Sequence, residues 1–152
     1  MKLSKLAFVV GLILSPLAQT TPAFADKAPI WTGFGSNVAI SGYDPVAYFT
    51  ANRPVRGVAA HKATYQGAEF RFATAANRAA FLANPARYAP QYGGYCAWAI
   101  SQGYTAGIDP NAWAIVDGKL YLNYNRSIQE RWQNDRANLI VAANRNWPNV
   151  LK

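Results

Sequence analysis

The sequence holds one thiol, Cys96, and one imidazole, His61. Thiolate and imidazole are ligands that copper and zinc sites favour, so this pair is a candidate site for a soft metal ion. The two residues match no metal-binding spacing, and a closed site would need further ligands, such as Asp44 or Asp109. The alternative is structural: Cys96 packs as a small hydrophobic residue, and His61 lies on an exposed loop.

Aromatic residues form a second candidate site. Tyr92 and Tyr95 flank the glycine pair Gly93-Gly94, and Tyr121 lies in a later apolar run. A tyrosine combines an aromatic face with a hydroxyl group, which suits a partly wet binding surface. We therefore expect a tyrosine-rich surface, formed by these three tyrosines with Asp109, to bind a small ligand or a protein. Core packing is the alternative explanation for these side chains.

The sequence gives little support for an enzyme. Cys96 and His61 could act as nucleophile and base, but no local nucleophile signature surrounds the cysteine and no third residue is placed to orient the imidazole. The metalloprotease, serine-hydrolase and phosphate-loop motifs are absent. We therefore expect a binding protein without catalytic activity, whose partner is a metal ion or a small ligand.

Length and composition narrow the class of protein further. A chain of 152 residues is long enough for one domain. Its hydrophobic fraction of 51% and charged fraction of 14% exclude a disordered chain and a coiled coil. Lysine and arginine outnumber aspartate and glutamate by 15 to 7, but the basic residues are scattered rather than clustered. Scattered charge does not favour a nucleic-acid partner.

Two β-hairpins are predicted from short apolar runs that flank turn dipeptides. The first joins 63–65 to 68–72 through Gln66-Gly67, and the second joins 113–116 to 120–122 through Asp117-Gly118. The two hairpins differ in composition, so we expect no internal repeat of useful length.

Helices are predicted between and after the hairpins. Short helices are expected over 45–50, 75–83 and 85–88, because Asp44, Thr74 and the Asn84-Pro85 pair provide capping or first-turn residues. Ser127 to Glu130 has the spacing of a capping box and predicts a long C-terminal helix over about 128–145. The sequence thus predicts an α+β fold: a small single domain with two short antiparallel β-hairpins packed by several helices.

The first residues have the features of a secretory signal peptide. Lys2 and Lys5 precede an apolar run over 6–14, and Ala23-Phe24-Ala25 forms a small-residue cleavage site. The apolar run is too short for a stable membrane anchor. We therefore expect cleavage after Ala25 and a periplasmic or secreted mature protein. Residues 26–37 lack a period and predict an extended N-terminal arm.

Three aromatic or aliphatic side chains are available to anchor this arm: Ile30, Trp31 and Phe34. In an oxidising compartment a single cysteine has no partner within its own chain. Cys96 is therefore a buried thiol, a functional thiol, or one half of a bridge between two chains.

Several segments of the chain together resemble secreted bacterial YHS-domain proteins. The matching stretches are Gly42-Tyr43-Asp44-Pro45-Val46-Ala47-Tyr48-Phe49, the Asn84-Pro85 region, Gln91-Tyr92-Gly93-Gly94-Tyr95-Cys96-Ala97, Asp109-Pro110, Val116 to Tyr124, and Trp147-Pro148. The resemblance implies a YHS-like domain over 38–152.

The YHS resemblance also implies an association with metal ions. The wider YHS group looks like a small α+β module that occurs beside heavy-metal transport ATPases and some multicomponent hydroxylases. Related modules bind metal through several cysteines, whereas this sequence has only Cys96, so only this residue carries over as a candidate ligand. His61 is a second candidate ligand because imidazole binds the same metal ions, and it matches no family motif. The two resulting hypotheses are a soft-metal site of copper or zinc at Cys96, and a small-ligand or protein-interaction surface in which Cys96 is buried and structural.

Overall fold

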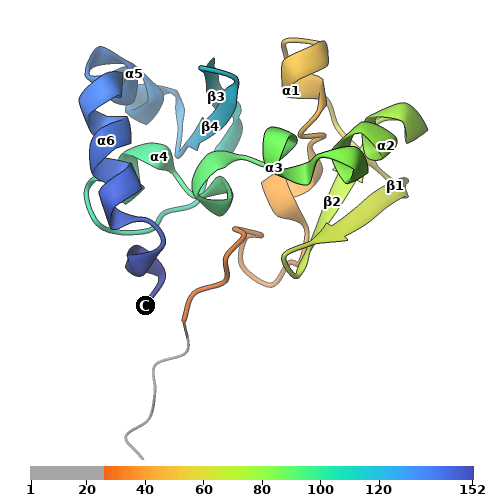
Figure 1. Cartoon of the computed structure of the whole chain (residues 1–152), viewed down its shortest axis with the longest axis horizontal. Coiled ribbons are helices and arrows are strands. Elements are labelled where there is room, and N and C mark those ends of the chain that lie inside the picture. The colour runs from red at the N-terminus through yellow and green to blue at the C-terminus, as the bar shows by residue number, and fades with distance from the viewer. Residues whose placement is uncertain (1–25) are drawn as a thin grey trace, which may run out of the picture.

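The computed structural model describes residues 26–152, so the predicted signal peptide lies outside the described residues. The helices are α1 (Ala47–Thr50), α2 (Ala75–Ala83), α3 (Pro85–Tyr88), α4 (Ala97–Ser101), α5 (Arg126–Asn134) and α6 (Arg136–Asn146). The strands are β1 (Val58–Tyr65), β2 (Ala68–Phe72), β3 (Asp109–Val116) and β4 (Lys119–Asn123). Two antiparallel hairpins with helices around them confirm the predicted α+β class (Figure 1).

In each hairpin the first strand begins earlier in the sequence than the apolar run that predicted it. In both turns the two central residues have positive φ, 48° and 83° at Gln66-Gly67 and 50° and 72° at Asp117-Gly118. Such turns match the twist of the flanking strands. β1 begins at Val58 and β3 at Asp109, because each strand continues through an irregular segment before its regular pairing starts. The sequence signal is weaker there because several of these residues are exposed.

The structure contains a repeat that the sequence did not predict. β1, β2 and α2 begin at residues 58, 68 and 75, and β3, β4 and α5 begin at residues 109, 119 and 126, each 51 residues later. The paired residues of the two hairpins shift by the same amount, including the irregular segment. We call residues 39–83 the first unit and residues 91–134 the second unit. The expectation of no internal repeat is therefore wrong at the level of the backbone.

The two units also begin in the same way. A short 3₁₀ turn opens each one, at Ala39–Gly42 and at Gln91–Gly94, and both turns contain left-handed residues. The repeat is not evident in the sequence because the two units share few side chains. The turn and strand geometry recurs, but apolar residues of different size fill each unit.

The second hairpin lies between two hydrophobic clusters and contributes side chains to both. Leu120 and Leu122 of β4 pack in a cluster with Phe70, Phe72 and other residues of the first unit. Tyr121, which lies between them on the opposite face, packs in a second cluster with Trp132. Alternate side chains of a strand point to opposite faces, so one strand joins both cores. In Figure 1 the β3–β4 hairpin accordingly lies between α5 and the elements of the first unit.

The C-terminal region is helical as predicted, and it bends at Asp135. Asp135 leaves the helical region (φ −136°, ψ 35°), and this residue divides α5 from α6. Its side chain accepts a hydrogen bond from Asn138 Nδ2 at 2.8 Å, a local contact that favours the end of a helix over its interior. The predicted cap at Ser127 is wrong: Asn125 caps α5 by accepting from the Ile128 N–H at 2.8 Å.

The N-terminal arm has no helix or strand over 26–37, as predicted, and it is anchored at fewer points than expected. Ile30 is buried in the first cluster and Trp31 packs against the second. Phe34 is fully exposed, so its predicted anchoring role is wrong. The arm then joins β2, where the Glu69 N–H donates to the Asn37 carbonyl at 2.8 Å. No helix within residues 26–152 combines the length and the apolar character needed to cross a bilayer.

Candidate functional site

A buried carboxylate holds the start of α1 in the first unit. Asp44 has no exposed surface, and its Oδ1 accepts hydrogen bonds from the N–H groups of Val46 at 2.8 Å and Ala47 at 3.3 Å. Its Oδ2 accepts from the Ala73 N–H at 2.8 Å and from Asn77 Nδ2 at 2.7 Å. The predicted capping role of Asp44 is thus confirmed. We call this set of donors the Asp44 socket.

Cys96 occupies the corresponding position of the second unit. The Asp44 N–H donates to the Val55 carbonyl at 2.8 Å, and the Cys96 N–H donates to the Ala106 carbonyl at 3.0 Å. Both residues lie just before a short helix: Asp44 three residues before the first residue of α1, and Cys96 directly before α4. The backbone therefore places Cys96 in the second unit where it places Asp44 in the first. We call the position of Cys96, with the N–H groups of Trp98, Ala99 and Tyr124 around it, the second socket.

The thiol in the second socket is held in its neutral form. Burial raises the pKa of Cys96, and backbone hydrogen bonds from Ala99, Tyr124 and Trp98 oppose this effect only in part. The N–H groups of Ala99, Tyr124 and Trp98 occupy the positions of Ala47, Ala73 and Val46 in the Asp44 socket, but the Trp98 N–H donates to Asn123 Oδ1 at 3.1 Å. A single sulfur atom replaces two carboxylate oxygens, so the second socket is incompletely filled.

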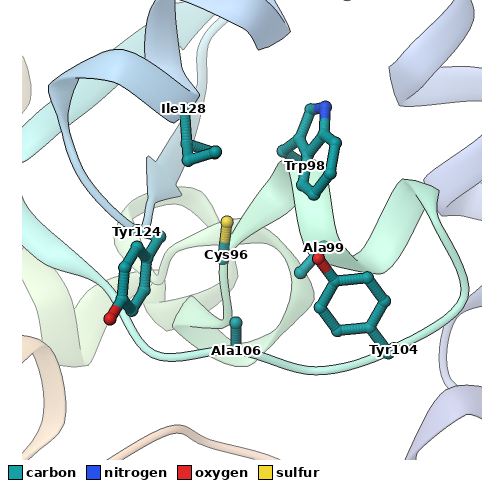
Figure 2. Close-up of a pocket in the computed structure, with 7 residues that line it drawn as sticks. All are labelled: Cys96, Trp98, Ala99, Tyr104, Ala106, Tyr124 and Ile128. Carbon is teal, nitrogen blue, oxygen red and sulfur yellow. The ribbon is translucent and has the colours of Figure 1, made fainter.

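The unfilled space beside Cys96 is an apolar pocket of about 200 Å³. Its walls are side chains from α4, the segment after it, the residue after β4 and the first turn of α5: Trp98, Ala99, Tyr104, Ala106, Tyr124 and Ile128. Figure 2 shows the Cys96 sulfur pointing into the space between these side chains. Ile128 stands where the first unit has Asn77, so an apolar side chain replaces the fourth donor of the Asp44 socket.

Two half-exposed tyrosines stand at the mouth of the pocket. Tyr104 is 48% exposed and Tyr124 is 57% exposed, whereas Cys96 and Ala99 are each 1% exposed. The Trp98 and Tyr104 rings meet edge to face, with 6.3 Å between their centroids. The pocket therefore has a buried floor that carries the thiol and an aromatic rim that faces solvent.

Asn123 supports the floor of the pocket and was not identified from the sequence. Its side chain is fully buried, and its Oδ1 accepts from the Trp98 N–H at 3.1 Å and from the Cys96 thiol at 3.7 Å. Its Nδ2 has no hydrogen-bond partner among the described residues. A single asparagine at the end of the apolar run Leu120-Tyr121-Leu122 was the available signal, because a polar residue there is buried with its strand.

The structure does not bring the predicted metal ligands together. His61 lies on β1 and Cys96 precedes α4, and these two elements lie well apart in Figure 1. Asp109 begins β3, where its Oδ1 accepts from the Asn111 N–H at 2.8 Å. No group of three or more His, Cys, Asp or Glu residues within 26–152 could hold a metal ion. The described residues thus do not fit the copper or zinc site proposed for Cys96 and His61.

The three tyrosines predicted to form a binding surface are buried instead. Tyr92, Tyr95 and Tyr121 are 4–5% exposed and pack in the second cluster. Tyr92 donates to Asn144 Oδ1 at 2.9 Å and Tyr95 donates to the Ala28 carbonyl at 2.8 Å. The prediction of an exposed tyrosine-rich surface at these residues is therefore wrong; the aromatic rim belongs to Tyr104 and Tyr124.

Comparison with known proteins identifies part of the chain. Residues 46–92 match the family model of the YHS domain, so the predicted resemblance is confirmed over this segment. The segment covers α1, the first hairpin, α2 and α3, and ends before Cys96. No curated protein and no solved structure matches the chain. The Cys96 pocket therefore lies in the second unit, outside the matched YHS domain.

Proposed function

We propose that this YHS-domain protein is a non-enzymatic binding module that holds a small apolar ligand, the size of one aromatic ring, in the Cys96 pocket. The observation that carries this proposal is the pocket of about 200 Å³ with a buried floor and an aromatic rim. Empty cavities of about 150 Å³ with apolar walls bind benzene, so the volume suits a single-ring ligand.

The lining chemistry supports an apolar ligand over an ion. Trp98, Tyr104 and Tyr124 offer ring faces and edges, and Ile128 offers a branched aliphatic surface. Aromatic pairs in offset or edge-to-face geometry gain about 0.5–1.5 kcal/mol beyond the burial of area. Burial raises the pKa of Cys96, and a neutral thiol is a polarizable neighbour for an aromatic ring but a poor metal ligand.

Calorimetric titration of the purified protein with toluene tests the proposal. We expect saturable binding with one site, and we expect Ala106→Leu to abolish it because the added side chain fills the pocket. Ala137→Leu makes the same substitution on the exposed surface of α6 and should bind toluene as the unmodified protein does. Absence of binding to the unmodified protein, or equal binding to both variants, would show that the pocket is not the site.

A second titration separates this proposal from the soft-metal hypothesis. Cu(I) and Zn(II) are added under reducing conditions to the unmodified protein and to Cys96→Ser. We expect no stoichiometric complex with either ion. A one-to-one complex that Cys96→Ser loses would instead favour a metal-handling protein with Cys96 as a ligand.

We further propose that the protein is exported. The basic residues Lys2 and Lys5, the apolar run over 6–14 and the Ala23-Phe24-Ala25 site support this proposal. Amino-terminal sequencing of the protein recovered from the periplasm or the medium should begin at Asp26. A mature protein that retains residues 1–25 would contradict cleavage at this site.

A further inference from the structure

A second cavity, of about 420 Å³, lies between the N-terminal arm and the first unit. Its walls come from three segments: the arm at Thr32, Gly33 and Ser36, the turn at Ser41 and Gly42, and the arginines Arg56 and Arg71. The volume falls in the range of small-molecule sites. We call it the arginine groove.

Backbone pairing holds the two arginines on one wall of the arginine groove. The Gly57 N–H donates to the Gly42 carbonyl at 2.9 Å, and Tyr43 forms a β-bridge with Arg56. A Cβ atom on Gly57 would lie only 2.5 Å from the Arg71 carbonyl oxygen, so the backbone approaches β2 as closely as glycine allows. This approach fixes Arg56 next to Arg71.

The guanidinium groups retain free donors. Arg71 Nε donates to Glu69 Oε1 at 2.7 Å, and its two terminal nitrogens make no hydrogen bond to residues 26–152. Arg56 lies over the Tyr43 ring, with 4.8 Å from Cζ to the centroid, and Nη1 reaches the Ser41 carbonyl only at 3.5 Å. Stacking on a ring orients a guanidinium and leaves its edge able to bind an anion.

The remaining lining adds hydroxyl donors and no carboxylate. The Ser36 hydroxyl accepts from the Val38 N–H at 3.0 Å, so its own proton is available, and the Ser41 hydroxyl has no hydrogen-bond partner among the described residues. Glu69 lies beside the groove and neutralises part of the charge, but Lys62 is 3.6 Å from its Oε2. Three cations thus face one carboxylate in this region.

We propose that the arginine groove binds a phosphate group. Two guanidinium groups with free edges match the oxygens of phosphate, and hydroxyl donors from Ser36 and Ser41 complete the recognition. This site is independent of the Cys96 pocket, because it lies between the N-terminal arm and the first unit and shares no lining residue with that pocket.

The position of Phe34 favours a lipid headgroup as the source of the phosphate. The side chain is fully exposed next to Gly33, which lines the groove. An exposed aromatic residue beside a cationic site suits the surface of an anionic membrane, where the ring enters the lipid and the arginines bind headgroup phosphates. A soluble phosphate ester would use the same groove without Phe34.

Titration with inorganic phosphate, followed by amide chemical shifts, tests the phosphate site. We expect saturable shifts at Gly33, Ser41, Gly42 and Gly57, and an affinity lower by about tenfold or more in Arg56→Gln and in Arg71→Gln, because each loses a charged hydrogen bond. Arg131→Gln removes an exposed charge from α5 and should retain the affinity of the unmodified protein. Arg56 is exposed, so its variant should keep the fold even if Arg71→Gln does not.

Vesicles distinguish the two sources of phosphate. Binding to vesicles of phosphatidylglycerol and phosphatidylcholine that Phe34→Ala weakens, with phosphate affinity unchanged, supports a lipid headgroup. Phosphate binding without such vesicle binding supports a soluble ester. Absence of saturable phosphate shifts, or an equal loss of affinity in Arg131→Gln and Arg56→Gln, would overturn the phosphate site itself.

Discussion

The first and second units use one backbone plan for different purposes. In the first unit, four donors converge on the Asp44 carboxylate, which has no exposed surface. In the second unit, Cys96 replaces the carboxylate and Ile128 replaces Asn77, and a pocket of about 200 Å³ results. The pocket therefore reflects side-chain differences on a repeated backbone: Cys96 and Ile128 replace Asp44 and Asn77, and Trp98 and Tyr124 form walls where the first unit has Val46 and Ala73.

The largest expected effect is the loss of the Asp44 carboxylate. Asp44→Ala leaves the Ala73 N–H and the Asn77 amide without their acceptor, so we expect the free energy of unfolding to fall by about 3–4 kcal/mol. Cys96→Ala, the matched change in the second unit, should cost about 1 kcal/mol or less, because only a small apolar group is lost. Urea denaturation measures both, and equal losses would remove the distinction between the two units.

A smaller effect on stability is expected at Asn123. This asparagine has no counterpart in the first unit, which has Phe72 at the equivalent position. Asn123→Ala removes the acceptor for the Trp98 N–H, so we expect a loss of about 1–3 kcal/mol in unfolding free energy. Asn111→Ala, on the exposed part of β3, is the control and should cost less. An unchanged stability of Asn123→Ala would show that the floor of the pocket does not depend on this residue.

An exchange of residues between the units tests whether the two sockets are equivalent. Cys96→Asp alone places a carboxylate in a socket that has an apolar fourth wall. Addition of Ile128→Asn restores the donor that Asn77 provides in the first unit. We expect the double variant to be more stable than Cys96→Asp by about 1 kcal/mol, and a double-mutant cycle measures this coupling. Additive effects of the two substitutions would argue against equivalent sockets.

The smallest effect concerns alkaline pH and falls mainly on the second unit. Burial raises the pKa of Cys96, Tyr92, Tyr95 and Tyr121 in the second unit and of Tyr48 in the first. The unfolded chain releases these protons first, so stability is fully present below about pH 8, where unfolded thiols and phenols are protonated, and falls as pH rises further. Urea midpoints between pH 7 and pH 10.5 measure this slope.

Two tyrosine variants identify the source of the alkaline slope. Tyr121→Phe removes one buried phenol and should flatten the dependence of stability on pH. Tyr104→Phe makes the same substitution at a half-exposed residue and is the matched control for loss of a hydroxyl group. If Tyr121→Phe keeps the full slope, burial of this phenol does not contribute to it.

Local signals predicted much of the fold. The turn dipeptides Gln66-Gly67 and Asp117-Gly118 and the caps at Asp44 and Thr74 depend on neighbouring residues only, and the structure has each of these turns and caps. The start of α5 was misplaced because Asn125 and Ser127 are both good capping residues, and only the path of the chain after β4 selects Asn125.

The candidate site was harder to predict because it depends on contacts across the chain. Cys96 was selected from the sequence as the only thiol, but its neighbours Trp98, Tyr124 and Ile128 come from segments that only the fold joins. His61 and Cys96 were paired by chemical type, which carries no information about distance. Tyrosines near a glycine pair suggested a surface, whereas the arm and α6 cover Tyr92 and Tyr95.

The most direct test of the account is a map of amide and methyl chemical shifts in the presence of saturating toluene. We predict shifts at Cys96, Ala99, Tyr124 and the Ile128 methyl groups, and none at Val46, Ala73 or Asn77 around the filled Asp44 socket. Shifts that saturate only in the second unit would show that the unfilled socket is the binding site. Shifts in both units alike, or none that saturate, would contradict the claim that the exchange of Asp for Cys creates a ligand site.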